Sequence, residues 1–131
     1  MDARNFMKYI KLHVVLTLAV VTLSLIFATS LGNIYEQFLN ADLDGSLLGD
    51  GTFWGPIIGF PLGIIFFASV LFTAWGEGLR DKWGWGLLAL PVIFEVVFDF
   101  SHLYFPILLG LVGYGVGWVI RKLLKHTRRD A

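Results

Sequence analysis

The chain contains apolar runs that are too long for the core of a small soluble domain. His13–Leu31 extends for nineteen residues and Phe53–Trp75 for twenty-three, both without an Asp, Glu, Lys or Arg. Because an α-helix rises about 1.5 Å per residue, each run can cross a hydrocarbon layer roughly 30 Å thick. Hydrophobic residues make up 56% of the 131 residues, more than a soluble fold of this size can bury. The sequence therefore predicts an integral membrane protein.

A third apolar region, Trp83–Ile120, predicts two shorter spans joined by a tight hairpin. Its thirty-eight residues fall just short of the roughly forty that two full crossings need. We place the turn near Ser101–Phe105, with spans over 83–101 and 104–120. The predicted fold is all-α, a single membrane domain over residues 1–131 built as a compact bundle of four transmembrane helices.

The first run also fits a second interpretation. A basic start, an apolar core and the small residues Ala28-Thr29-Ser30 are typical of a secretory signal peptide with its cleavage site. The four-span interpretation instead keeps 13–31 as a membrane helix. We prefer the uncleaved helix, and the signal peptide stays an alternative.

Charged residues divide sharply between the predicted connections. The long connection 32–52 carries only acidic charges, at Glu36, Asp42, Asp44 and Asp50. All ten basic residues lie in the N-terminal segment, the turn at 76–82 and the tail at 121–131: Arg4, Lys8, Lys11, Arg80, Lys82, Arg121, Lys122, Lys125, Arg128 and Arg129. Lys and Arg mark the cytoplasmic side of membrane proteins. The pattern predicts two cytoplasmic termini and an outer acidic loop, and the small size favours a prokaryotic inner membrane.

Three ionisable side chains interrupt the apolar stretch Pro91–Pro106 (PVIFEVVFDFSHLYFP). Glu95, Asp99 and His102 are spaced by four and three residues, within an arc of about 60° on one face of a continuous helix. Glu95 lies some 18 Å along that helix from Trp83, near the bilayer midplane. A charged group there costs about 2.5–3.5 kcal/mol on insertion scales, so it suggests a functional site.

This stripe supports three functional interpretations. In the first, which we favour, the protein is a transporter or channel in which Glu95 binds a proton or cation and Asp99 and His102 relay it from outside. In the second, the protein is a non-catalytic accessory or assembly subunit of a larger membrane complex. Glu95 would then bond to a hydroxyl of a neighbouring helix, from Ser69, Thr73 or Tyr114.

The third interpretation is a membrane-embedded enzyme in which Glu95, Asp99 and His102 hold a metal ion. No recognised metal-binding motif supports it, and His13 and His126 are predicted on the opposite side of the membrane. The chain has no cysteine, which excludes thiolate ligands and disulfides. We therefore predict that an enzymatic role is less probable than a non-enzymatic one.

Glycines at spacings of four predict where helices approach closely. Gly55, Gly59 and Gly63 form a ridge on the second span, and Gly113 and Gly117 form another on the fourth. Such ridges fit packing within one chain or between copies in a homo-oligomer. Ten acidic residues balance the ten basic ones, so nothing in the charge predicts a nucleic-acid partner.

Overall fold

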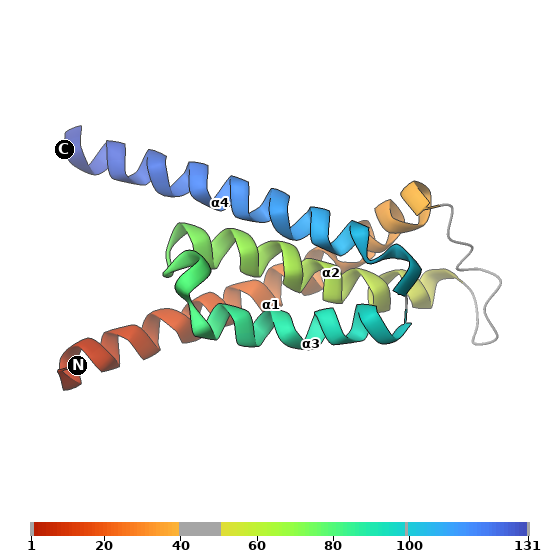
Figure 1. Cartoon of the computed structure of the whole chain (residues 1–131), viewed down its shortest axis with the longest axis horizontal. Coiled ribbons are helices and arrows are strands. Elements are labelled where there is room, and N and C mark those ends of the chain that lie inside the picture. Colours follow the sequence, from red (N-terminus) through yellow and green to blue (C-terminus); the bar gives the residue numbers. More distant parts are fainter. Residues whose placement is uncertain (1, 40–50, 99, 131) are drawn as a thin grey trace.

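A computed structural model describes residues 2–39, 51–98 and 100–130, and every regular element in them is helical (Figure 1). The all-α prediction is therefore confirmed. The predicted loop residues Asp42, Asp44 and Asp50 lie outside the described residues, as does Asp99. The elements are α1 (Ala3–Leu39), α2 (Gly51–Ala74), η1 (Gly78–Arg80), α3 (Lys82–Phe98), η2 (Phe100–His102) and α4 (Tyr104–Asp130).

Three of the four helices are long and apolar enough to cross a membrane. The candidate spans are Ala3–Gln37 within α1, Pro56–Ala74 within α2, and α4. These lengths indicate a membrane protein. Helix α3 has 17 residues, about 26 Å of helix, which is slightly less than the hydrocarbon thickness. Its crossing of the bilayer therefore stays a prediction.

Helix α2 lies at the centre of the arrangement and packs against each of the other three helices. In Figure 1, α3 and α4 lie on either side of α2 and do not pack extensively on each other. One buried cluster joins α1 to α2 through Leu16, Val20, Ala68 and Phe72. A second cluster, near the opposite end, joins α1, α2 and α4 through Tyr35, Leu62 and Phe105.

Glycines of α2 allow α1 to approach its backbone. A Cβ added at Gly59 would overlap the carbonyl oxygen of Ala28, and one at Gly63 would lie 3.0 Å from Cα of Ser24. No larger side chain fits at these contacts without moving a backbone. The ridge is therefore used inside the monomer, while the surroundings of Gly55 lie outside the described side chains.

The glycines of α4 make the equivalent contact with the other side of α2. A Cβ at Gly113 would lie 2.7 Å from the carbonyl oxygen of Phe66, and one at Gly117 would overlap that of Val70. Because lipid is as apolar as a helix surface, close backbone packing of this kind is a main source of helix association in membranes.

Helix α1 is longer than the predicted span, since it begins at Ala3 and continues to Leu39. Part of the segment expected as an acidic loop is therefore helical. The physical reason is Tyr35, which is buried and meets the ring of Phe105 edge-on at a centroid distance of 5.6 Å. This contact holds the last turns of α1 against α4 despite their polar composition.

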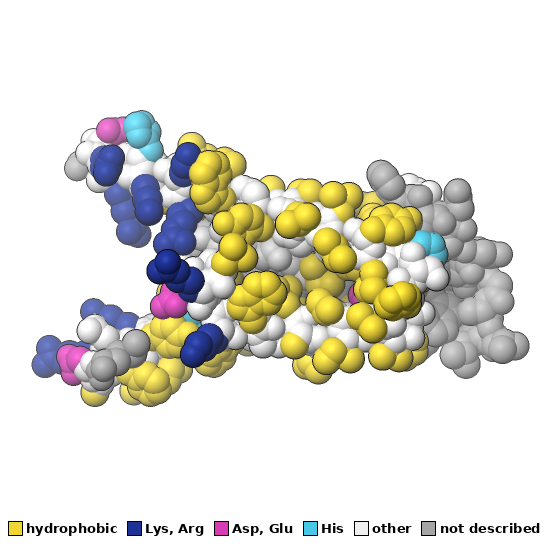
Figure 2. Space-filling view, in the orientation of Figure 1, with side chains coloured by type: hydrophobic (Ala, Val, Ile, Leu, Met, Phe, Trp, Pro, Cys, Tyr) yellow, Lys and Arg dark blue, Asp and Glu magenta, His cyan; other side chains and the backbone are white. Residues whose placement is uncertain are grey.

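Both termini lie at the same end of the molecule (Figure 1). Figure 2 shows Lys and Arg side chains gathered at this end, while hydrophobic side chains cover the middle. The turn between α2 and α3, which contains η1, is at the same end and adds Arg80 and Lys82. The fold thus brings the three basic segments of the sequence together.

Candidate functional site

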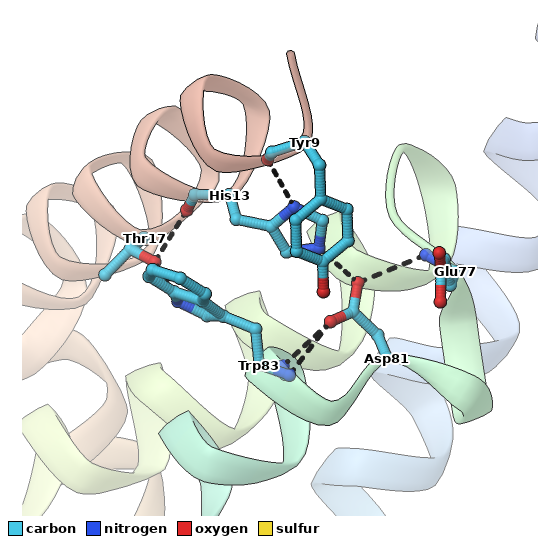
Figure 3. A network of polar contacts seen from close by, with 7 residues as sticks. Tyr9, His13, Thr17, Glu77, Asp81 and Trp83 are labelled. Carbon is cyan, nitrogen blue, oxygen red and sulfur yellow. Dashed lines mark hydrogen bonds and ion pairs between the residues drawn. The ribbon is translucent and has the colours of Figure 1, made fainter. Parts of the chain in front are cut away.

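A buried histidine–aspartate pair joins α1 to the turn before α3 (Figure 3). Nε2 of His13 lies 2.8 Å from Oδ2 of Asp81, and the two side chains are 1% and 0% exposed. On the other side of the imidazole, Nδ1 lies 2.8 Å from the carbonyl oxygen of Tyr9. The pair therefore connects residues 68 positions apart in the sequence.

Asp81 also caps the start of α3. Its Oδ1 accepts hydrogen bonds from the backbone N–H groups of Trp83 at 3.1 Å and Gly84 at 3.2 Å. Its Oδ2 accepts a third from the N–H of Glu77 at 3.2 Å. The first turn of a helix leaves N–H groups without intrahelical partners, and an aspartate at this position satisfies them.

The balance of these contacts favours the ionised carboxylate. Burial by itself raises the pKa of Asp81. The hydrogen bond from His13 and the backbone N–H groups of Glu77 and Gly84 outweigh burial, so the pKa lies below its ordinary value.

Both ring nitrogens of His13 take part in hydrogen bonds. A backbone carbonyl only accepts, so Nδ1 donates to the carbonyl oxygen of Tyr9. The second hydrogen bond joins Nε2 to Oδ2 of Asp81. Together the two bonds hold the ring in one orientation between α1 and the turn before α3.

Aromatic side chains enclose the pair. The ring centroid of His13 lies 3.9 Å from that of Tyr9 and 5.8 Å from that of Trp83. The indole N–H of Trp83 donates to the Thr17 hydroxyl at 2.9 Å, and that hydroxyl donates to the carbonyl oxygen of His13 at 2.7 Å. The network fastens α1 to α3 around a pair that is itself buried.

Sequence reasoning missed this pair. His13 was treated as the first residue of a span and Asp81 as part of a charged turn. Two signals could have revealed it: an aspartate directly before an apolar helix is a typical N-cap, and the predicted topology puts His13 at the same membrane boundary as the 76–82 turn.

Glu95 is also buried, but it lacks the hydrogen bonds that surround the carboxyl group of Asp81. Its side chain is 2% exposed, and Oε1 has no hydrogen-bond partner in the part of the chain that the structure describes. The predicted bond from Ser69 is not formed, because the Ser69 hydroxyl donates to the carbonyl oxygen of Ile65 at 2.7 Å. The predicted bonds from Thr73 and Tyr114 to Oε1 are not formed either.

Glu95 lines a groove of about 420 Å³ between α2, α3 and α4, here called the α3–α4 groove. On α3 the lining residues recur at helical spacing, so one face of that helix forms a wall. The opposite wall comes from α4, and α2 forms the floor. The full lining is Ile65, Ser69, Trp85, Leu88, Ala89, Val92, Glu95, Val96, Leu103, Pro106, Ile107 and Gly110.

A larger crevice of about 520 Å³, between α2 and α3, provides a comparison. Pro61, Leu90 and Phe94 are among its lining residues, and none of the described residues that line it is charged. Glu95 therefore distinguishes the α3–α4 groove from an ordinary apolar crevice on a membrane helix bundle.

His102 is not on the helix that carries Glu95. Helix α3 ends at Phe98, and His102 lies in η2, so the single helical face assumed for the stripe is not formed. The ring of His102 lies 6.2 Å from those of Tyr35 and Tyr104 and does not line the α3–α4 groove. Asp99 lies outside the described residues.

Within residues 2–39, 51–98 and 100–130, no group of three or more His, Asp or Glu side chains is placed to hold a metal ion. The predicted metal site includes Asp99, so it stays a prediction. No family model matches the chain, and no curated protein or solved structure matches it either. Inference about function therefore depends on the two buried carboxyl groups.

Proposed function

We propose that this protein is an accessory or assembly subunit that binds a transmembrane helix of another membrane protein in the α3–α4 groove. The observation that carries this proposal is Oε1 of Glu95, a buried carboxyl oxygen without a hydrogen-bond partner among the described residues. A polar atom in an apolar environment costs free energy unless it is hydrogen-bonded. A bound partner is the simplest source of the missing bond.

The walls of the groove fit a membrane partner. Val92, Val96 and Ile107 are 44%, 42% and 61% exposed, so apolar side chains border the groove on both helices. Lipid chains would cover these side chains equally well, but lipid chains carry no group that can bond to Glu95. Helix association in membranes depends on packing and on hydrogen bonds between helices, and the groove offers both.

The proposed arrangement includes four spans with both termini in the cytoplasm. The gathering of Lys and Arg at one end supports this orientation. Helix α3 would cross as the shortest span, with Asp81 and the basic turn at the cytoplasmic surface. A prokaryotic inner membrane remains our proposed location.

Ion or proton transport through Glu95 is the competing proposal. A pathway needs polar groups or water along its length, yet among the described residues Ser69 and Trp85 are the only other groove-lining residues with polar side-chain atoms. The test is flux of protons, sodium, potassium, magnesium and calcium into proteoliposomes, with wild type and Glu95→Gln compared. Wild-type flux that Glu95→Gln abolishes would establish transport and contradict our proposal.

The groove itself can be tested by filling it. Val92→Trp places a large side chain in the α3–α4 groove, while Leu90→Trp makes the same change in the uncharged crevice. We expect a membrane protein to co-purify in fixed stoichiometry with wild type and Leu90→Trp, and to be lost with Val92→Trp. Wild type that purifies alone from its native membrane, or equal loss in both variants, would contradict the proposal.

A further inference from the structure

We infer that the partner helix is a different protein that carries a Lys or Arg near the middle of its membrane span, and that this cation pairs with Glu95. The inference rests on the proposed function and identifies the partner's chemistry. The observation behind it is Glu95, which lines the α3–α4 groove and whose buried Oε1 has no hydrogen-bond partner among the described residues. A cation there would form a charge-assisted hydrogen bond, the strongest kind available to a carboxylate.

The depth of Glu95 excludes the lipid headgroups as the source of this cation. Glu95 lies thirteen residues after Lys82, about 20 Å along α3 from its basic end. Since the hydrocarbon layer is roughly 30 Å thick, the carboxyl group lies well inside it. Headgroup amines lie at the surface, so only a side chain from within a span reaches Glu95.

The chain's own sequence excludes a second copy as the source. It has no Lys or Arg between Lys11 and Arg80, and none between Lys82 and Arg121. All ten basic residues therefore lie at the same end of the fold, far from the depth of Glu95. A second copy could bury its apolar surface against the groove but could not bring a Lys or Arg to this carboxyl group. The partner must be another chain.

The pairing would also explain why each chain carries a costly residue. A Lys or Arg at the bilayer centre costs about as much free energy as an acid, so each helix is less stable in the membrane by itself. Together in the groove, the two charges neutralise each other away from lipid. The pair would therefore favour assembly of the complex over either free subunit.

Synthetic transmembrane peptides test this directly. Three peptides share a Leu/Ala helix with Trp at both ends and differ at the central position, which is Lys, Gln or Leu. The full-length protein, labelled at one introduced cysteine because it has none of its own, is reconstituted with each peptide in phosphatidylcholine liposomes. Energy transfer between the labels then reports binding as a function of peptide-to-lipid ratio.

We expect the Lys peptide to bind about tenfold more tightly than the Leu peptide, with Gln between them. Glu95→Gln should reduce the Lys preference to less than about twofold, and Leu90→Trp should leave it unchanged. Equal binding of the Lys and Leu peptides to wild type would overturn the inference, and this comparison needs no variant to fold. A Lys preference that persists in Glu95→Gln would also overturn it.

The two proposals fail in different ways. If Lys and Leu peptides bind equally and Val92→Trp releases both, the groove binds helices whether or not they carry a charged residue. The partner inference is then wrong and the proposed function stands. If no peptide binds and no protein co-purifies with wild type, both are wrong.

Discussion

Two carboxyl groups are buried in the described part of the chain, and they differ in how their oxygens are bonded. Asp81 receives four hydrogen bonds, one from His13 and three from backbone N–H groups. Glu95 has an oxygen, Oε1, that receives none from the described residues. The first carboxyl group is fully hydrogen-bonded within the fold, whereas the second keeps a buried oxygen without a partner among the described residues.

Position along the helix explains the difference. Asp81 precedes α3, where free N–H groups of the first turn point toward it. Glu95 lies in the middle of α3, where the backbone N–H groups are already bonded to carbonyls one turn earlier. A mid-helix carboxyl group can be satisfied only by another side chain, by water or by a bound molecule.

Removal of the Asp81 carboxylate should give the largest effect on stability. Asp81→Ala leaves the buried His13 without its hydrogen-bond partner and leaves the first turn of α3 uncapped, so we expect a loss of about 3–5 kcal/mol. Unfolding in mixed detergent micelles, followed by helix circular dichroism, measures it. A loss below about 1 kcal/mol would mean that the pair is not a structural link and would remove the contrast with Glu95.

A substitution that disturbs packing gives a loss of stability with which the electrostatic effects can be compared. Gly59→Leu forces a side chain into the carbonyl oxygen of Ala28, so we expect a loss of about 1–3 kcal/mol. Gly115→Leu is the matched control, because nothing lies within 4 Å of a Cβ at that position. Equal stability of the two variants would show that α1 and α2 are not as close as described.

The Asp81 carboxylate should also make stability depend on pH in the acid range. Because its pKa is lowered by folding, its contribution is fully present above the ordinary value of about 3.9 and is lost as the pH falls through the lowered value. The Tm difference between wild type and Asp81→Asn should therefore shrink below about pH 4. A difference that grows on acidification would contradict the assigned direction.

The sequence predicted most of the fold, for reasons that are visible in its residues. Long uncharged runs determine membrane helices, and G-xxx-G spacing predicted the contacts of Gly59 and Gly117 with neighbouring backbones. The division of the third apolar region into two helices follows from its length, whereas the tight hairpin of two spans stays a prediction. These features depend on local composition and length, so one sequence is sufficient to recognise them.

The sites were harder to predict because they depend on distant residues. Glu95 stood out as an acid in an apolar run, but nothing local indicated that Ser69 bonds elsewhere or that Oε1 has no partner among the described residues. The pair of His13 and Asp81 depends on the crossing of α1 and α3, which periodicity does not specify. His102 was assigned to a helix that ends four residues earlier, since a polar stripe alone does not mark a helix end.

The most direct test of the contrast is one pair of matched substitutions in the isolated protein. Asp81→Asn and Glu95→Gln each replace a carboxylate with an amide of similar shape. We measure Tm for both in the same detergent at neutral pH. Asp81→Asn should lower the stability by about 1–3 kcal/mol, whereas Glu95→Gln should leave it unchanged or raise it. A loss for Glu95→Gln as large as that for Asp81→Asn would show that Glu95 is bonded within the fold, and it would contradict the account.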